Sequence, residues 1–540
     1  MTTRNPTFYL HGTSADSHVF QIDGVDVMSA IQNNDRYMNL STEAIADIQV
    51  KTSAVDASSP LGLGLVVNLA SVSGSDRLRG TSAFVWQPQF WNDTNGPAGS
   101  SQSMAVKQLD FSLGGPVLRG RSWFYTSHRY GRSLAGLSRS PRVIQVLRAL
   151  EPGFDEFEPS IRDRYSFLKS TTQLTPTHQL AALYSNDERS EGSTDALAAR
   201  DFNDRTTGGP LLSAKWSSTW TNSFLTRVLL SYNWKRTLFD PRRTDVPGRT
   251  VHERVFLSGG RLLGSGAIAR LDNSTAAGFE FPASKSTLSV DAIFFHPAWF
   301  GSHEVQAGFF AQPRLHDEWV ARYHAGGFQQ EEVVLVDPQN PGAGVRPFHR
   351  QIFEVDRLTT QLVDSRDVAA YLQDLWRPSN RLTVAVGVRV DWIRRMDRLF
   401  NRVTQDSVEI GPRFGATFLV TSDARNVVHG SWGLVHENLS VNQTTAGTNV
   451  AGVRDLYDLN LDGIFETAFV TPGRRQAAGN GNIQVDLDHY HQSFADEWTA
   501  GYRRQWPQHV TTNVTLIRRS YRDRPAAVEV NGIYDGGVFR

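Results

Sequence analysis

The most defined chemical motif in the sequence is DLNLDGIFE, residues 458–466. Asp458, Asn460 and Asp462 place side-chain oxygens at alternate positions, and Gly463 follows them. This is the spacing of the first half of a calcium loop, in which alternate oxygens converge on the ion and glycine permits a sharp turn. The sequence therefore predicts a structural calcium site with Asp458, Asn460 and Asp462 as ligands.

The second half of this motif departs from a complete calcium loop. The twelfth position, where a bidentate glutamate closes the site, is Phe469. Glu466, at the ninth position, is the substitute that we consider. The alternative is a polar turn stabilised by its own Asp and Asn side chains. The sequence leaves both interpretations open.

Other reactive residue types indicate no site. The chain has no cysteine, which excludes thiolate metal centres, cysteine nucleophiles and disulfides. The HDEW segment at 316–319 and the pair His489 and His491 lack partners at metal-binding spacing, so we interpret these histidines as loop residues. The acidic run at 151–159 favours a solvated loop over a cation-binding surface. With no phosphate loop and no Ser-His-Asp set, we predict that the chain is not an enzyme.

Composition narrows the class of protein. The chain has 540 residues, too many for one ordinary core. Its 55 Lys plus Arg balance 55 Asp plus Glu, so it has no basic field for a nucleic-acid partner. No apolar run is long enough for a transmembrane helix. A transmembrane β-barrel remains compatible, because its alternating strands average to a polar composition.

Alternation of apolar and polar residues predicts many β-strands. In RLTVAVGVRVDW, at 381–392, apolar side chains take every second position, while Arg389 and Asp391 lie on the other face. In two further segments Leu229 and Asp496 are exceptions to the alternation. The segments with the same pattern are 224–234, 494–502 and 510–518.

Short connections alternate with long polar segments along the chain. The short ones lie at 118–121, 175–178, 219–223, 377–380, 421–426 and 506–509. The long ones lie near 88–105, 133–162, 188–208, 238–285, 313–365, 394–408 and 437–490. An up-and-down barrel in an outer membrane has this pattern, with tight turns on the periplasmic side and long loops outside. A soluble sandwich or propeller is the alternative, although long structureless loops are uncommon in compact domains.

Aromatic residues recur at or near the predicted strand ends. Amphipathic rings are favoured there, at the level of the lipid headgroups. The alternative for any single ring is an ordinary core position, so only the recurrence indicates aromatic girdles. The residues concerned are Trp123, Phe124, Trp220, Phe224, Trp376, Trp392, Trp498 and Trp506.

The segments 8–28 and 40–86 resemble the second half of the plug and the first barrel strand of TonB-dependent outer-membrane receptors. The resemblance rests on Ile22-Asp23-Gly24 between two short strands, on AIADIQV at 44–50 after an expected helix, and on a Gly-rich turn before a strand. That turn and strand contain Gly62, Gly64 and Asn68. The segments 110–132, 371–392 and 410–433 are similar to barrel strands of the Oar-like branch of this family.

The resemblance implies an all-β fold in two parts. Residues 1–76 are expected to form the C-terminal part of a plug inside the lumen, and residues 77–540 a transmembrane antiparallel up-and-down barrel. We count about 15 strands, whereas the family barrel has about 22. The family's signal peptide, TonB box, first half-plug and aromatic-terminated last strand are not found. We therefore expect a fragment of a longer receptor, truncated within its barrel.

The resemblance further implies transport of a large substrate across the outer membrane of a Gram-negative bacterium. Membrane lipid would surround the barrel. The TonB–ExbB–ExbD complex would act on the plug where the full-length protein carries a TonB box. The ligand and the direction of transport are not determined. The alternatives are a surface-binding or adhesive outer-membrane protein without transport, a non-functional gene fragment, and a secreted all-β carbohydrate-active enzyme, which would need paired carboxylates.

Overall fold

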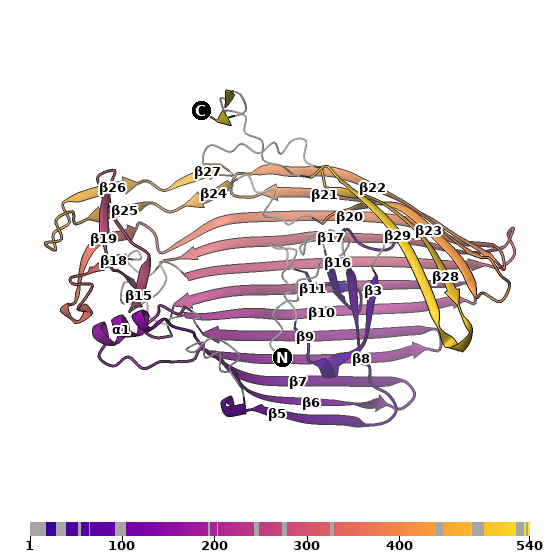
Figure 1. Ribbon diagram of the computed structural model, residues 1–540. Coiled ribbons are helices and arrows are strands. Elements are labelled where there is room, and N and C mark those ends of the chain that lie inside the picture. Colours follow the sequence, from indigo (N-terminus) through magenta and orange to yellow (C-terminus); the bar gives the residue numbers. More distant parts are fainter. Residues whose placement is uncertain are drawn as a thin grey trace.

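The computed structural model describes residues 18–28, 39–51, 56–63, 65–91, 104–192, 195–201, 203–241, 248–272, 278–323, 329–438, 447–477, 491–524, 534–535 and 538–539. Within these residues the fold is almost entirely β, with one α-helix, α1, at Pro141–Leu150. No helix in the described ranges has the length and apolar character needed to cross a membrane. A fifteen-stranded sheet, a six-stranded outer sheet and a four-stranded N-terminal sheet account for most of the described residues (Figure 1).

The N-terminal sheet has four short strands in the order β2-β1-β4-β3. Asp23 and Gly24 both have positive φ, +51° and +91°, which is the geometry of a type I′ hairpin turn. Asp-Gly favours this turn because glycine adopts positive φ without steric cost. The 44–50 segment forms a strand after a three-residue 3₁₀ turn, η2, at Thr42–Ala44. The strands are β1 (Val19–Ile22), β2 (Val25–Asp26), β3 (Ile45–Lys51) and β4 (Val66–Ser71).

The large sheet contains fifteen strands within the described residues, and successive neighbours pair antiparallel. Its order follows the sequence from β5 at one edge to β29 at the other, so it is an up-and-down meander. The strands are β5 (Arg79–Gln87), β6 (Met104–Leu118), β7 (Ser122–Ala135), β8 (Ser160–Thr175), β9 (His178–Gly192), β10 (Asn203–Thr221), β11 (Phe224–Pro241), β16 (Gly278–His296), β17 (Ser302–Arg322), β20 (Arg357–Ser379), β21 (Leu382–Asp397), β22 (Arg402–Leu419), β23 (Asn426–His436), β28 (Phe494–Gln505) and β29 (Thr511–Arg522).

The polarity of the two faces of the large sheet is the reverse of that in a soluble protein. On β21, Val386 is 53% exposed on the outer face, whereas Arg389 and Asp391 are buried on the inner face. The same holds on β28, where Trp498 is 53% exposed and Glu497 is buried. A sheet with an apolar exposed face and a polar covered face fits a lipid environment outside and a polar lumen inside.

The structure explains both exceptions to the alternation. Leu229 lies on the inner face of β11, where it packs in an apolar cluster with Phe20 and Ile22 of the N-terminal sheet. Asp496 lies on the outer face of β28 and accepts a hydrogen bond from the Trp432 indole Nε1 at 2.9 Å. Leu229 thus packs against the domain inside the sheet, and Asp496 serves as the acceptor for a neighbouring indole.

Short turns gather at one end of the large sheet and the longer insertions at the other (Figure 1). The prediction of a long connection at 394–408 is wrong. There β21 extends to Asp397 and β22 begins at Arg402, with a four-residue turn between them. Outer-face residues of these strands pair with each other, as in the hydrogen bond from Trp392 Nε1 to Asp406 Oδ1 at 2.8 Å. A strand that continues beyond the apolar band carries polar residues on both faces, so its sequence resembles a loop.

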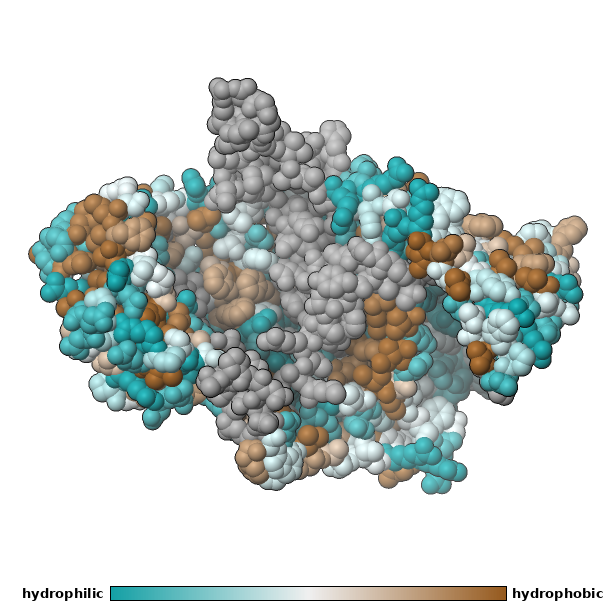
Figure 2. Space-filling model, in the orientation of Figure 1, coloured by the Kyte–Doolittle hydropathy of each residue, from teal (hydrophilic) through white to brown (hydrophobic). Residues whose placement is uncertain are grey.

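The longer insertions are not structureless. They contribute a six-stranded outer sheet in the order β15-β12-β18-β19-β25-β26, built from segments more than 200 residues apart. Together with α1 it lies at the end opposite to the short turns, where hydrophilic and hydrophobic residues intermingle (Figures 1 and 2). Its strands are β12 (Gly248–His252), β15 (Ala267–Leu271), β18 (Gln329–Leu335), β19 (Val345–Phe353), β25 (Val453–Tyr457) and β26 (Thr467–Thr471).

Smaller pieces complete the fold. Three two-stranded ribbons pair β13 (Val255–Ser258) with β14 (Arg261–Gly264), β24 (Gly447–Val450) with β27 (Arg474–Ala477), and β30 (Tyr534–Asp535) with β31 (Val538–Phe539). Three further 3₁₀ turns are η3 (Gln89–Trp91), η4 (Pro341–Ala343) and η6 (Pro507–His509).

Candidate functional site

The N-terminal sheet is seated against the inner face of the large sheet. Its apolar residues form one cluster with wall residues of five consecutive strands, β7 to β11. The wall residues are Tyr125, Phe167, Leu183, Leu211 and Leu229. Burial of these side chains on both partners gives the contact a hydrophobic core. The domain is therefore a packed part of the molecule rather than a tethered appendage.

The hairpin turn of this domain is held from two sides. Gly24 N donates to Asn68 Oδ1 at 3.0 Å, so two positions that the sequence analysis quoted separately meet here. Asp23 accepts from Ser71 N at 2.9 Å and from Lys169 Nζ on wall strand β8 at 2.9 Å. The Asp-Gly turn thus serves both to close the hairpin and to attach it to the wall.

Further polar contacts between domain and wall follow the large sheet to its far edge. Lys285 Nζ on β16 lies 3.0 Å from Asp26 Oδ2 and donates to Met28 O at 2.8 Å. Gln373 Oε1 on β20 accepts from Ala57 N at 2.7 Å. Arg519 Nη1 on β29 donates to Leu63 O at 2.8 Å. The contacts reach from β8 to β29, so many strands of the wall hold the domain.

A buried ion pair supports one of these attachments. Lys235 on β11 pairs with Asp187 on β9, and each side chain is only 2% exposed. Asp187 Oδ2 also accepts from Asn39 N at 2.8 Å and from Asn39 Nδ2 at 3.1 Å. This pair is not predicted from the sequence. The only indication in the sequence is that Lys235 falls on the polar face of an alternating strand. Its partner, Asp187, is determined by the register of β9, β10 and β11.

A polar cavity of about 340 Å³ lies between the domain and the wall. Domain residues such as Gln49 and Asn68 form one side, and residues of β10, β11, β16, β17, β20 and β21 form the other. Charges of both signs line it, with six cationic and five anionic side chains. They are Lys51, Lys215, Arg227, Lys285, Arg389, Arg395, Asp23, Asp26, Asp291, Asp367 and Asp391. Such a lining favours water and polar solutes without selecting a charge.

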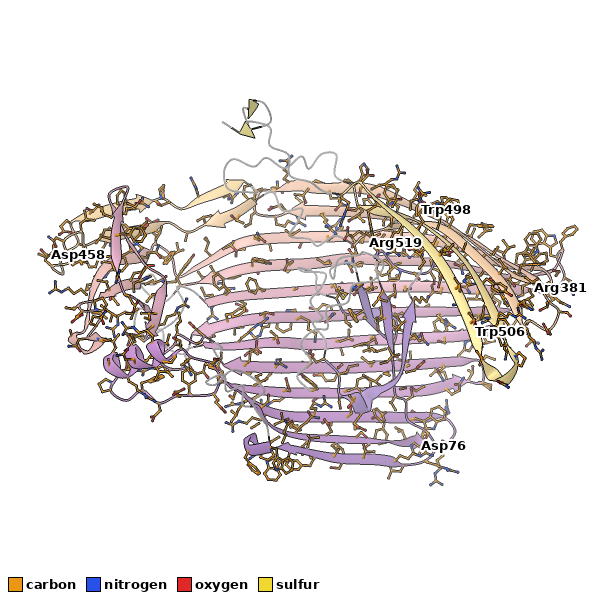
Figure 3. All side chains as sticks on the ribbon, in the orientation of Figure 1. Asp76, Arg381, Asp458, Trp498, Trp506 and Arg519 are labelled. Atoms are coloured by element: carbon orange, nitrogen blue, oxygen red, sulfur yellow. The ribbon has the colours of Figure 1, made fainter. Side chains whose placement is uncertain are left out.

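The predicted calcium loop lies at the outer end of the molecule, far from the short-turn residues Asp76 and Arg381 (Figure 3). The side chain of Asp458 is buried, and its two oxygens accept from Asp462 N at 3.2 Å and Gly463 N at 2.7 Å. Asn460 Oδ1 accepts from Asp462 N at 2.9 Å. Gly463 has a φ of +96°, as the sharp turn requires.

The structure brings Glu466 into this loop. One carboxylate oxygen each from Asp458, Asp462 and Glu466 lie within 4.8 Å of one another. Phe469, at the twelfth position, instead lies on β26 with the Arg261 guanidinium 4.1 Å from its ring centroid. Several hard oxygen donors around one point suit calcium better than softer metals. The residues present therefore fit the ion, with Glu466 in the place where Phe469 cannot act.

The other residues considered from the sequence have structural surroundings. The prediction that His316 is a loop residue is wrong. His316 lies on β17, and its Nδ1 is 2.8 Å from Asp364 Oδ1. His491 Nδ1 lies 3.6 Å from Glu409 Oε1, whereas His489 lies outside the described residues. In the acidic run, Glu151 pairs with Arg200 at 2.8 Å. The acidic run is thus partly neutralised by neighbouring arginines.

A second buried polar group, not predicted, joins three strands of the outer sheet. His349 on β19 has Nε2 2.8 Å from Asp455 Oδ1 on β25 and Nδ1 3.4 Å from Glu332 Oε2 on β18. Its ring stacks on Tyr457 with centroids 4.4 Å apart. Burial acts to lower the pKa of His349, but the contacts with both carboxylates outweigh it and raise the pKa.

We compared the sequence and the fold with those of known proteins. No family model and no curated protein matches the sequence. Solved structures do match, at low identity. The siderophore receptor PirA from Acinetobacter baumannii has a TM-score of 0.58 and 12% identity, over 95% of this chain and 64% of that one. The outer membrane transporter YddB from Escherichia coli has 0.56 and 12%, over 95% and 70%. The siderophore receptor PirA from Pseudomonas aeruginosa has 0.56 and 13%, over 97% and 70%.

The chain shares the β-barrel fold of these receptors and transporters. The all-β prediction, with a large antiparallel sheet and a small inner domain, is confirmed. The chain spans only 64% of the length of the first of these structures, so activity, substrate and partners are matters for proposal. The Oar-like branch and the expected truncation stay predictions.

Proposed function

We propose that this chain is part of a TonB-dependent receptor that moves a large substrate across the outer membrane of a Gram-negative bacterium. In this proposal residues 1–76 act as a plug portion and residues 77–540 as barrel. The observation that carries it is a domain packed inside a sheet whose outer face is apolar. Ligand would bind at the outer sheet and loops, and the TonB–ExbB–ExbD complex would act on the full-length protein.

The interface between plug and wall supports movement of the plug as the transport step. It combines two separate apolar clusters, the second joining Leu63 to Val435 and Ala495, with scattered polar contacts and the 340 Å³ polar cavity. Polar contacts exchange with water at little net cost, whereas a continuous apolar interface does not. The similar structures are receptors and transporters, which favours a non-enzymatic role.

A covalent tether between plug and wall would test transport against surface binding. Ala57 of the plug is buried, and a Cβ built at Gly387 of β21 would lie 2.9 Å from its Cβ. This is about 1 Å shorter than the Cβ separation of a relaxed disulfide, so a small shift of the 56–63 segment would allow Ala57→Cys and Gly387→Cys to join. These 540 residues contain no cysteine, so no other disulfide within them competes.

The tether experiment uses the full-length protein that contains this chain and begins with cell fractionation, which should place it with the outer membrane. Cells are then supplied with labelled iron chelates, oligosaccharides and peptides. If the protein is a transporter, cells with the reduced double-cysteine variant should accumulate one class of labelled substrate. Oxidation to the disulfide should stop this accumulation, and it should have no effect on either single-cysteine variant. Surface binding that is unchanged by oxidation, with no accumulation in either state, would favour an adhesive protein. Recovery outside the outer membrane would contradict the proposal.

We propose, as a second and structural function, that the 458–466 loop binds calcium. The supporting observation is the convergence of Glu466 with Asp458 and Asp462, which supplies the carboxylate missing at the twelfth position. Loops exposed outside the cell commonly bind calcium with Kd of about 10⁻⁴ to 10⁻³ M. Bound calcium would hold β25 to β26 and stiffen the outer sheet.

Calcium titration to about 10 mM should raise the midpoint of thermal unfolding, or slow amide exchange in 453–471, with a saturable response. Asp458→Asn should remove most of the response. Asp337→Asn is the matched control, because Asp337 also caps an outer turn, accepting from Gln339 N at 2.8 Å. An equal response in both variants would show that the loop is a polar turn only, and an equal effect of magnesium would contradict a calcium-selective site.

A further inference from the structure

Three cations stand side by side on the outer face of β6, β7 and β8. In the cross-strand register, Lys107 is opposite Arg132, and Arg132 is opposite Arg162. All three are exposed and share the parity of apolar outer-face residues on the same strands. Those neighbours are Leu109, Tyr130 and Leu168, which are 45%, 57% and 46% exposed. We call Lys107, Arg132 and Arg162 the cation row.

This arrangement is unfavourable unless an anion joins it. Like charges directly opposite each other on neighbouring strands repel. Within the described part of the chain, no member of the cation row makes an ion pair with a carboxylate. The adjacent Arg164 does, with Nη1 3.7 Å from Glu188 Oε1. Among the described residues, a carboxylate thus neutralises the fourth cation and none neutralises the other three.

A second pair of outer-face arginines shows the contrast. Arg366 on β20 is opposite Arg394 on β21, again in cross-strand register. Here Arg394 Nε has the Asp406 carboxylate at 3.8 Å. In this second pair, a carboxylate of the chain thus accompanies the two outer-face cations. The cation row has no such partner in the part of the chain that the structure describes, which points to an external one.

The height of the cation row suggests what that partner is. The three residues lie about 10 to 13 residues from the short-turn ends of their strands, and roughly 9 to 11 residues of tilted strand cross a membrane. Charged residues on the lipid face are costly at the midplane and nearly free at the interface. On neighbouring β5, Trp86 is opposite Lys107, and its ring lies 5.7 Å from that of Trp91.

We propose that the cation row binds the phosphate groups of a phosphorylated glycolipid in the outer leaflet, whose acyl chains lie along the apolar face below. Guanidinium groups bind phosphate oxygens through paired N–H donors, and the ammonium of Lys107 adds a point charge. The apolar belt directly beneath favours an amphiphile over a free anion or a nucleic acid. The inference rests on the proposed outer-membrane location.

The test is binding of the purified 540-residue chain, in nonionic detergent, to bis-phosphorylated lipid A and to its phosphate-free form. We expect the native chain to prefer the phosphorylated form, and added salt to weaken that preference. Replacing all three residues, as Lys107→Gln, Arg132→Gln and Arg162→Gln, should weaken binding of the phosphorylated form roughly a hundredfold, at about fivefold for each cation. Binding of the phosphate-free form should not change.

The control variant is Arg366→Gln with Arg394→Gln, which removes outer-face cations from a matched height and should leave lipid A binding unchanged. If the triple variant folds poorly, Arg132→Lys with Arg162→Lys is the second variant to test. It keeps both positive charges and should retain most of the affinity for the phosphorylated form. Equal losses for both lipid forms, or full competition by inorganic phosphate alone, would overturn the inference. Failure to fractionate with outer membranes would contradict the proposed location and leave this binding readout intact.

Discussion

At the scale of single residues, the inner face of the sheet depends on charges that are paired out of contact with water. Breaking a buried pair leaves an uncompensated charge, which costs far more than the pair contributes. Lys235 and Asp187 are the clearest case, because Asp187 also holds Asn39 of the plug through two hydrogen bonds. This pair therefore couples the stability of the wall to the seating of the plug.

Lys235→Met should lower the free energy of unfolding by about 3–5 kcal/mol, because it leaves the Asp187 carboxylate buried without a counter-charge. Guanidinium unfolding followed by tryptophan fluorescence would measure it. Arg164→Met is the matched control, since that pair is 64% and 48% exposed and should cost under about 1 kcal/mol. A similar loss in both variants would mean that the buried charge is neutralised in some other way. The double variant Lys235→Met with Asp187→Leu should recover much of the loss.

At the scale of elements, the outer sheet depends on one histidine that bridges three strands. The contact with the His349 imidazole holds the pKa of Glu332 below its usual range. The raised pKa of His349 stabilises the fold below the pKa of an unfolded histidine, about 6.5, and this contribution is lost as pH rises through the folded pKa. The contribution of Glu332 is lost as pH falls through its lowered pKa.

The outer sheet should therefore be most stable between about pH 4.3 and 6.5, and less stable at pH 8.5. Amide exchange of β19 and β25, corrected for intrinsic rates, would show faster opening at the higher pH. His349→Gln should remove this dependence. His178→Gln is the control, because His178 contacts the Ser218 hydroxyl and, among the described residues, forms no ion pair with a carboxylate. A pH dependence that survives His349→Gln would assign the effect to another group.

At the scale of the whole molecule, the large sheet has two edges in its described part, β5 and β29. Backbone N–H and C=O groups along such edges have no strand to pair with, and in a lipid environment each unsatisfied group is costly. Central strands such as β10 and β17 have partners on both sides. The protection of the backbone should therefore fall from the middle of the sheet toward both edges.

In detergent micelles, amides of β5 and β29 should exchange at least about tenfold faster than those of β10 and β17, because local opening costs least where pairing is one-sided. Hydrogen–deuterium exchange with mass spectrometry would measure this profile. Uniform protection across all four strands would mean that the two edges pair with each other or with another chain, and would replace the open sheet by a closed one.

The sequence by itself determined the local structure. Period-two alternation predicted the strands, because successive side chains in a strand point to opposite faces. Asp23-Gly24 predicted its hairpin, because positive φ is available to these residues at low cost. The spacing of Asp458, Asn460 and Asp462 predicted a tight polar loop. Each of these features depends on residues only a few positions apart.

Only the tertiary structure decided the rest. Alternation cannot tell which face meets lipid, so Leu229 and Asp496 were exceptions until the inner domain and the Trp432 indole were in place. The polar ends of β21 and β22 resembled a loop because strands beyond an apolar band no longer alternate. Lys235 and Asp187, and the cation row, are joined by strand register, which depends on the pairing of whole strands and is not encoded in any short segment.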